Sequence, residues 1–501
     1  MGIPVVIRLL GVFLLIISGF LLLPLVLGLL LGEYSMVPGF AVPILGGILF
    51  FGFSVLIQHL SMNNTTKGRG SQTILKRSKG NLTIRGGFLF VSLAWLSASA
   101  LGSLPYYISG FIPSFSYSFF ETMSGFTTTG ASILSNIEAL PRSLLFWRSL
   151  THWLGGMGIV VLTVALFPLL GVGGFHLVKA EAPGPTVDRI TPRITETAKI
   201  LWFIYLGFTI IQTILLYLGG MDLIDSLIHT FGTLATGGFS SNNASIGGYN
   251  SGYIHGVITF FMVVAGINFT LYHRLFLGSF SSLRANSELK AYLGIFCFAS
   301  LVIVADLLGH GVYTTLKEAV QYGTFQAASI MTTTGYATTD YDQWPTISRS
   351  ILFLLMFVGG SAGSTGGGIK VLRLVILFKI GSLHLKKLLE PRGIFIPRIN
   401  QRPLEKDSLE AVGGFIFLYI SILIGLTVAV SIAGYDLLSS FATALAILGN
   451  IGPGFGAVGP TMNYSGFPHW LTWILSLGMM LGRLELYTVL VILTPMFWKR
   501  H

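Results

Sequence analysis

The sequence predicts an all-α polytopic membrane protein made of four pseudo-repeats, preceded by two further transmembrane helices. Hydrophobic residues make up 52% of the chain and charged residues only 10%, whereas a soluble domain carries about 25% charged residues. Four times along the chain, an apolar run breaks at a short Thr/Gly-rich segment and a second apolar run follows. Internal repeats with broken helices that meet at one central site are typical of membrane transport proteins.

The first two predicted spans form an N-terminal transmembrane hairpin over residues 1–61. A membrane-spanning helix needs about 20 mainly apolar residues, and Val5–Leu31 is longer than that. It is also longer than the apolar core of a signal peptide, which has about 7–15 residues, and it shows no clear small-residue cleavage site. We therefore predict that this segment is a retained membrane span.

Each predicted repeat contains a spanning helix, a short pore helix, a filter-like segment and a second spanning helix. The repeats are assigned to residues 88–172, 198–280, 290–381 and 409–498. Their second spans are predicted as Leu145–Leu170, Tyr253–Leu277, Ser350–Lys379 and His469–Phe497. Residues 62–87, 173–197, 281–289 and 382–408 are predicted to be loops that connect these units.

The charges predict the orientation. The loop after the hairpin contains Lys67, Arg69, Lys76, Arg77, Lys79 and Arg85 and no acidic residue between them, so the positive-inside rule places it in the cytoplasm. With two spans in the hairpin and two in each repeat, all four basic loops and both termini lie on that side. Topology thus accounts for the formal net charge of +11, and no nucleic-acid partner is needed.

The four Thr/Gly-rich segments are the candidate cation-binding site. Non-helical backbone persists at membrane depth only where protein or a water-filled cavity satisfies it. Four such breaks around one axis would present carbonyl oxygens to a cation, at the negative ends of the short-helix dipoles. A lone Thr-Thr-Gly is usually a turn, but four in the same context favour a pore. The candidate filter residues are Thr128, Thr129, Gly130, Thr236, Gly237, Thr334, Gly335, Asn450, Ile451 and Gly452.

A glycine-rich run, Val358–Gly368, interrupts the second span of the third repeat. Each glycine costs a helix about 1 kcal/mol relative to alanine, so we predict a flexible intramembrane loop just inside the filter that can obstruct the pore. The alternative is a surface of small residues for close helix packing. The gate residues proposed in this run are Gly360, Ser361, Ala362, Gly363, Ser364 and Thr365.

Arg483 lies deep within the last predicted span, where a charged side chain is costly and points to a functional site. We predict that it faces the pore below the filter and contacts the Ser361–Thr365 segment as part of the gate. The alternative is a structural ion pair between helices.

Other polar residues in apolar segments have weaker signals. Glu121, in the first short helix, could tune the pore mouth or accept hydrogen bonds from backbone behind the filter. His152 and Asn268 are predicted to make polar contacts between helices rather than to be ligands. Asp306 is predicted to be solvated at the outer end of its span.

With these motifs, the chain resembles the Trk/Ktr/HKT superfamily of potassium transporters, and within it the bacterial TrkH-type subunits. Three further segments carry the resemblance, namely Trp153–Gly158, Ala180–Pro185 and Leu481–Glu485. The resemblance implies a homodimer in the bacterial cytoplasmic (inner) membrane, with one pore per protomer. It implies a filter lined by Gly130, Gly237, Gly335 and Gly452, with Gly130 pointing to potassium rather than sodium. It also implies a separately encoded cytosolic ring of nucleotide-binding TrkA-type subunits.

The predicted function is therefore potassium uptake through a selective, gated pore driven by the membrane potential, with potassium as substrate and no cofactor. The alternative is a symporter that couples potassium to protons or sodium. Proton and sodium relays usually leave acidic or His residues along the spans, and few are present. An enzyme is not predicted: no span carries paired carboxylates, and the single cysteine, Cys297, excludes an intrachain disulfide or a Cys-based metal site.

Overall fold

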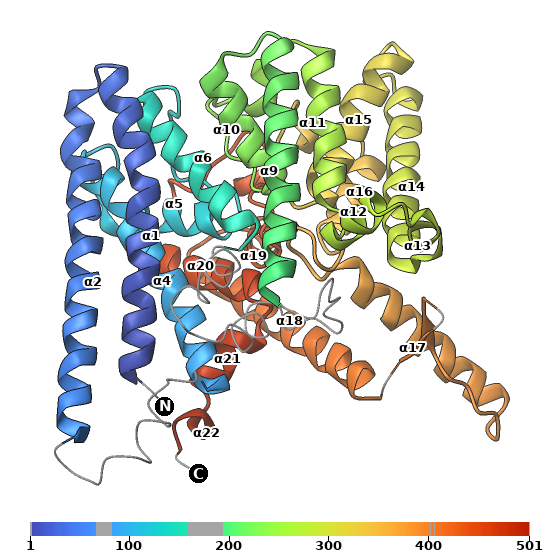
Figure 1. The fold of residues 1–501 in the computed structure, drawn as a ribbon. Coiled ribbons are helices and arrows are strands. Elements are labelled where there is room, and N and C mark those ends of the chain that lie inside the picture. Colours follow the sequence, from blue (N-terminus) through green and yellow to red (C-terminus); the bar gives the residue numbers. More distant parts are fainter. Residues whose placement is uncertain (1–2, 67–82, 159–193, 401, 405, 500–501) are drawn as a thin grey trace.

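The fold was analysed in a computed structural model that describes residues 3–66, 83–158, 194–400, 402–404 and 406–499 (Figure 1). These residues are overwhelmingly helical, which confirms the predicted fold class. One minimal antiparallel pair, β1 (Arg398–Ile399) with β2 (Arg402–Pro403), is the exception. The start of α1 and the end of α22 lie at the same end of the molecule (Figure 1).

The N-terminal hairpin consists of α1 (Ile3–Leu30) and α2 (Val37–Thr66), joined through the short η1 (Tyr34–Met36). Repeat 1 contains α4 (Ile84–Ile108), α5 (Phe115–Phe126) and α6 (Arg142–Gly156). Repeat 2 contains α9 (Ile194–Leu218), α10 (Leu223–Leu234), η3 (Ser245–Gly248), α11 (Gly252–Ala265) and α12 (Phe269–Phe276), and α13 (Phe280–Ala285) follows it.

Repeat 3 contains α14 (Ser287–Gly309), α15 (Leu316–Met331), η4 (Tyr341–Gln343), α16 (Thr346–Leu355) and α17 (Val371–Leu389). Repeat 4 contains α18 (Lys406–Ile432), α19 (Leu437–Leu448), η5 (Gly456–Val458), α20 (His469–Arg483), α21 (Tyr487–Leu493) and α22 (Pro495–Trp498). The third and fourth repeats thus follow the same helix order as the first two.

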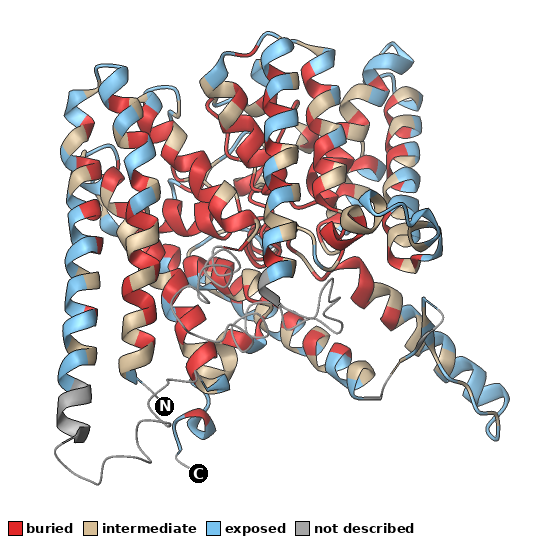
Figure 2. Cartoon of the chain, in the orientation of Figure 1, coloured by how far each residue is buried: buried red, intermediate tan, exposed pale blue. Residues whose placement is uncertain are grey.

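Six helices in the described part of the chain are long and apolar enough to cross a membrane. They are the two hairpin helices and the first helix of each repeat, α4, α9, α14 and α18. Their outer faces expose large apolar side chains, including Leu49, Phe203 and Phe417, and the buried residues lie toward the interior (Figure 2). This outward-facing apolar surface suits contact with lipid.

The second span is interrupted in the described part of every repeat. The break in repeat 3 was predicted as the glycine-rich loop, whereas the breaks in repeats 1, 2 and 4 correct the sequence prediction. In repeat 2, α11 and α12 meet at 93°, and the Asn268 side chain begins α12 by accepting from the Thr270 amide at 2.9 Å. In repeat 3, residues 356–370 separate α16 from α17. In repeat 4, Glu485 and Leu486 both have positive φ. In repeat 1, α6 ends at Gly156, and residues 159–172 lie outside the described part, as does most of the predicted loop 173–197.

The short helices α5, α10, α15 and α19 have only 12, 12, 16 and 12 residues. A helix rises 1.5 Å per residue, so none of them can cross a bilayer on its own. Their C-terminal halves are almost entirely buried. Each therefore ends in the interior of the protein and leads directly into one of the four Thr/Gly-rich segments.

Asp306 is buried rather than solvated, contrary to the sequence prediction. Its Oδ2 accepts hydrogen bonds from the Ser348 amide at 2.9 Å and the Ser348 hydroxyl at 2.6 Å. Ser348 lies in the first turn of α16, where amide groups lack partners within the helix and a negative charge is favourable. Asp306 on α14 thus caps the neighbouring helix of the same repeat.

Replacing this carboxylate is expected to destabilise the protein. Asp306→Ala leaves a buried amide and a buried hydroxyl without their acceptor, which costs about 1–3 kcal/mol. We expect a lower apparent melting temperature of the detergent-solubilised protein, followed by intrinsic fluorescence. Asp407→Asn, at the exposed start of α18, is the control and should leave the melting temperature nearly unchanged. Equal melting temperatures for the two variants would contradict the capping role.

Candidate functional site

The four Thr/Gly-rich segments have the same backbone conformation. Each begins with a non-glycine residue in the left-handed region, with φ of 54° at Thr128, 54° at Thr236, 61° at Thr333 and 54° at Asn450. Two residues later comes a glycine with φ between 78° and 90°, namely Gly130, Gly238, Gly335 and Gly452. We call the four segments Thr128–Gly130, Thr236–Gly238, Thr333–Gly335 and Asn450–Gly452 the four-turn ring.

The hydrogen bonds inside the turns follow one pattern as well. The amide of the middle residue of each turn donates to the carbonyl five residues earlier, in the preceding short helix. These bonds are Thr129 to Ser124 at 2.9 Å, Gly237 to Gly232 at 2.8 Å, Thr334 to Ser329 at 2.8 Å and Ile451 to Ala446 at 2.8 Å. The four turns therefore share one backbone conformation although their sequences differ.

The four turns contact one another in a closed cycle. The position that a Cβ would take on each glycine lies against a carbonyl oxygen of the next repeat. The distances are 2.1 Å from Gly130 to Gly237 O, 2.1 Å from Gly238 to Thr334 O, 2.1 Å from Gly335 to Ile451 O and 2.5 Å from Gly452 to Thr129 O. Real Cβ atoms do not come that close to an oxygen, so these glycines let the four backbones meet around one axis.

The structure shifts the assignment of the glycines in repeat 2. Gly238, not Gly237, matches Gly130, Gly335 and Gly452 in φ and in its contact with the next repeat. Gly237 occupies the middle position of its turn, equivalent to Thr129, and provides the carbonyl that faces Gly130. The sequence carried a signal for this alignment, because Ser132 and Ser240 each follow their ring glycine by two residues.

Buried polar side chains hold the ring from behind. The hydroxyl oxygens of Thr127 and Thr129 lie 2.7 Å apart, as do those of Thr332 and Thr334 in repeat 3. In repeat 4 an amide takes over, since Asn450 Nδ2 donates to Thr129 Oγ1 at 3.0 Å and to Met479 O at 2.9 Å. Asn450 therefore ties the fourth turn to the first.

His152, on α6, supports the ring between repeats 1 and 2. Its Nδ1 lies 2.7 Å from the carbonyl oxygen of Gly125 in α5, and its ring stacks on Phe239 at 4.0 Å between centroids. A Cβ on Gly237 would lie 2.5 Å from the His152 ring, so the imidazole fills the space that a threonine side chain would take in repeat 2. The predicted polar contact between helices is present.

The glycine-rich loop lies directly against the ring. The Gly367 amide donates to Thr333 Oγ1 at 2.7 Å, and a Cβ on Gly367 would lie 2.4 Å from Gly449 O. The Ser361 amide donates to Gly266 O at 2.8 Å, and the Phe269 amide donates to Gly363 O at 3.0 Å. The loop is thus fixed between the turns of repeats 3 and 4 and the break between α11 and α12.

Arg483 reaches this loop, as predicted from the sequence. Its Nη1 donates to Thr365 O at 2.7 Å, and its Nη2 donates to Gly155 O at 2.6 Å and to Gly156 O at 2.9 Å. The guanidinium therefore bridges the loop of repeat 3 and the C-terminal end of α6 in repeat 1. Glu485 instead pairs with Arg373 on α17, whose guanidinium lies 4.0 Å from the centre of the Phe415 ring.

Comparisons with known proteins agree with this architecture. Residues 57–500 match a family described as TrkH, cation transport protein. The chain is 40% identical over 428 residues to the Trk system potassium uptake protein TrkH of Escherichia coli K12, which covers 85% of this chain and 88% of that protein. It is 36% identical over 490 residues to the Trk system potassium uptake protein TrkH of Halomonas elongata, covering 95% and 98% of the two chains.

A solved structure is similar over the whole length. The crystal structure of the potassium transporter TrkH from Vibrio parahaemolyticus superposes with a TM-score of 0.85 at 34% sequence identity and covers 100% of both chains. With the apolar helices described above, these matches identify a multi-pass protein of the bacterial cytoplasmic membrane. The chain belongs to the TrkH family of cation transport proteins.

Proposed function

We propose that this protein takes up potassium by passive, gated conduction through the four-turn ring, driven by the membrane potential. The observation that carries the proposal is the closed cycle of four glycine-to-carbonyl contacts. The names of its relatives, which are Trk system potassium uptake proteins, support potassium as the ion. An inside-negative potential supplies about 2.3 kcal/mol per charge and 100 mV for inward movement.

The ring is suited to a partly dehydrated cation. All four short helices end at the ring, so their negative dipole ends favour positive charge there. Backbone carbonyls of the turns can replace part of the hydration shell, as in potassium channels. We propose as the ion-binding set Thr128, Thr129, Gly130, Thr236, Gly237, Thr334, Gly335, Asn450, Ile451 and Gly452, extended by Thr333 and Gly238 because their backbone is equivalent.

The glycine-rich loop is the proposed gate. Gly360, Ser361, Ala362, Gly363, Ser364 and Thr365 belong to a non-helical segment that contacts the ring on one side and Arg483 on the other. Two of its ties are single backbone hydrogen bonds to residues at the α11–α12 break. Such bonds contribute only about 1 kcal/mol each. The Ala362 amide also donates to Glu288 on α14 and the Thr365 hydroxyl to Ala265 O, so displacing the loop breaks several separate hydrogen bonds but unfolds no helix.

Two partners are proposed. A second copy of the chain would cover α17, which extends away from the helical body (Figure 1) and exposes large apolar side chains at Phe378, Leu385, Leu388 and Leu389. The relatives are named as components of a Trk system, which supports a cytosolic nucleotide-binding TrkA-type ring as the regulator of the gate. Mass photometry of the detergent-solubilised protein tests the homodimer.

Ion uptake into proteoliposomes tests the function. With an imposed inside-negative potential and no proton or sodium gradient, we expect strong uptake of rubidium, a potassium substitute, and weak uptake of sodium. Uptake that requires an added proton or sodium gradient would instead indicate a symporter. Comparable sodium and rubidium uptake would contradict potassium selectivity.

A further inference from the structure

After each of the four ring glycines, Gly130, Gly238, Gly335 and Gly452, the chain is hydrogen-bonded to a neighbouring repeat. The carbonyl two residues after the glycine accepts a hydrogen bond from the repeat that precedes it in the cycle. The bonds are Tyr464 N to Ser132 O at 2.8 Å, Arg148 Nη1 to Ser240 O at 2.9 Å, Gly247 N to Ala337 O at 3.0 Å and Tyr341 OH to Gly454 O at 3.0 Å. We call these four bonds the outer ties. They connect repeats 4 to 1, 1 to 2, 2 to 3 and 3 to 4.

The tie between repeats 1 and 2 differs from the others because its donor is charged. Arg148, on α6, is 1% exposed. Besides its bond to Ser240 O, it donates from Nε to Glu121 Oε1 at 2.7 Å, and its guanidinium lies 3.6 Å from the centre of the Phe239 ring. One side chain therefore fixes both residues that follow Gly238.

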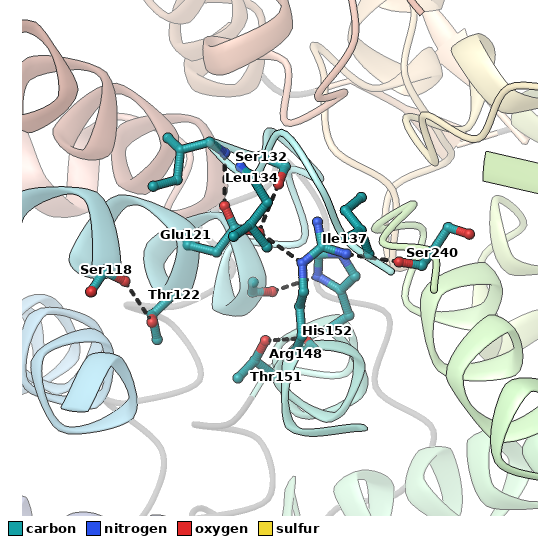
Figure 3. Close-up of polar contacts among 12 residues, drawn as sticks. Ser118, Glu121, Thr122, Ser132, Leu134, Ile137, Arg148, Thr151, His152 and Ser240 are labelled. Atoms are coloured by element: carbon teal, nitrogen blue, oxygen red, sulfur yellow. Dashed lines mark hydrogen bonds and ion pairs between the residues drawn. The ribbon is translucent and has the colours of Figure 1, made fainter. Parts of the chain in front are cut away.

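Glu121, on α5, completes the arrangement from the side of repeat 1 (Figure 3). It is fully buried, and its carboxylate accepts from Ser132 Oγ at 2.9 Å and from the Ile133 amide at 2.9 Å, in addition to Arg148. Ser132 and Ile133 are the second and third residues after Gly130. The carboxylate thus holds the residues that follow Gly130 in repeat 1, while the guanidinium holds the residues that follow Gly238 in repeat 2.

The pair connects the residues that follow two neighbouring glycines of the ring. Charge-assisted hydrogen bonds are shorter and stronger than neutral ones, and a buried pair with its remaining hydrogen bonds satisfied resists rearrangement. Gly130 and the Gly237 carbonyl meet at this same seam. A change in the reach of either charged side chain must therefore shift the carbonyls around which an ion would bind.

We propose that Glu121 and Arg148 are a positioning pair that sets the ring geometry between repeats 1 and 2 and thereby the discrimination between potassium and sodium. The proposal rests on the proposed function of the ring. Neither side chain contacts the ion, since each acts through backbone that follows a ring glycine. The sequence suggested a backbone contact for Glu121 as one option, but it gave no sign of Arg148 as its partner.

The decisive variant is Arg148→Lys. It keeps the buried positive charge, but a single ammonium lacks the planar fork of donors that binds Glu121 and Ser240 together. We expect the variant to fold and to conduct rubidium. Its rubidium-to-sodium permeability ratio should fall by about tenfold or more. The ratio is obtained from the reversal potential of reconstituted protein with rubidium on one side of the membrane and sodium on the other. Glu121→Gln, which keeps the shape but weakens the tie, should lower the ratio in the same direction.

The matched control is Arg142→Lys, because Arg142 pairs with Asp222 at 2.7 Å with both side chains about half exposed and should leave the ratio unchanged. The permeability ratio does not depend on how much protein is active, so a merely structural defect would not move it. A wild-type ratio in folded Arg148→Lys and Glu121→Gln would overturn the proposal, as would an equal loss in the control. Failure of the wild-type protein to conduct rubidium would count against the proposed function itself.

Discussion

Gly335→Ala is expected to abolish rubidium uptake. The methyl group would lie 2.1 Å from the carbonyl oxygen of Ile451 and 2.7 Å from Pro453 Cδ, and neither backbone nor proline ring can move aside at small cost. The clash has to be relieved by pushing turns 3 and 4 apart at the point where they meet. A barrier higher by about 1.4 kcal/mol already slows a rate about tenfold. We therefore expect uptake driven by an inside-negative potential to fall by more than about tenfold.

Gly110→Ala is the matched control for this experiment. Gly110 has the same φ of 80°, but a Cβ there would meet nothing within 4 Å. It therefore measures the cost of a left-handed alanine alone, which is about 1–2 kcal/mol, without the clash. We expect the control to retain uptake. Rubidium uptake by Gly335→Ala at the level of the control would show that the close approach of the turns is unimportant for conduction.

The repeat architecture could be read from the sequence because it depends on local patterns. Apolar length and Thr/Gly-rich breaks recur in the same order in all four repeats, and the structure has a short buried helix before each break. The breaks in the second spans were harder to see. Gly266, Ile267 and Asn268 lie inside an apolar run, and the sharp bend arises because Asn268 caps α12 and Gly363 receives the Phe269 amide.

The side chains behind the ring could be predicted only in part. Arg483 stood out because a charge inside an apolar span needs a partner, and the glycine-rich loop stood out by composition. Arg148 did not, because its helix is not strongly apolar and its partners lie 27 and 92 residues away in sequence. Gly238 was missed because two adjacent glycines left the register ambiguous; its φ of 78° and its contact with Thr334 O fix it.

The ring and the loop are held by different contacts, so the proposed gate can open without a change in the geometry of the ring. The turns are held by the short helices and by the outer ties. The loop is held by backbone hydrogen bonds, by the Gly367–Thr333 contact, by the Glu288 carboxylate that accepts from the Ala362 amide, by the Thr365 hydroxyl that donates to Ala265 O, and by Arg483. Releasing Arg483 breaks the bridge between repeats 3 and 1 but leaves the glycine-to-carbonyl contacts of the ring intact. A gate of this kind would change the rate of flux without changing its selectivity.

Arg483→Ala is accordingly expected to raise rubidium uptake by the protein in the absence of any partner. The substitution removes the donors to Thr365, Gly155 and Gly156. Hydrogen bonds of charged groups contribute about 1.5–3 kcal/mol each, so the balance between the docked and the displaced loop should shift by about tenfold or more. In the proposed gate, it also removes a fixed positive charge that would repel cations passing the loop. Rubidium flux should therefore increase while the rubidium-to-sodium permeability ratio stays near the wild-type value.

Arg142→Ala provides the comparison. Arg142 also forms an ion pair, with Asp222 at 2.7 Å, but both side chains are about half exposed, and such pairs contribute little to stability. Flux through this variant should equal that of the wild type. An unchanged flux in Arg483→Ala would remove the arginine from the gate, whereas a reduced flux would mean that its three carbonyl contacts hold the conducting form. An increased flux with a collapsed permeability ratio would place the effect in the ring itself, so measuring both quantities on one preparation separates the gate from the filter.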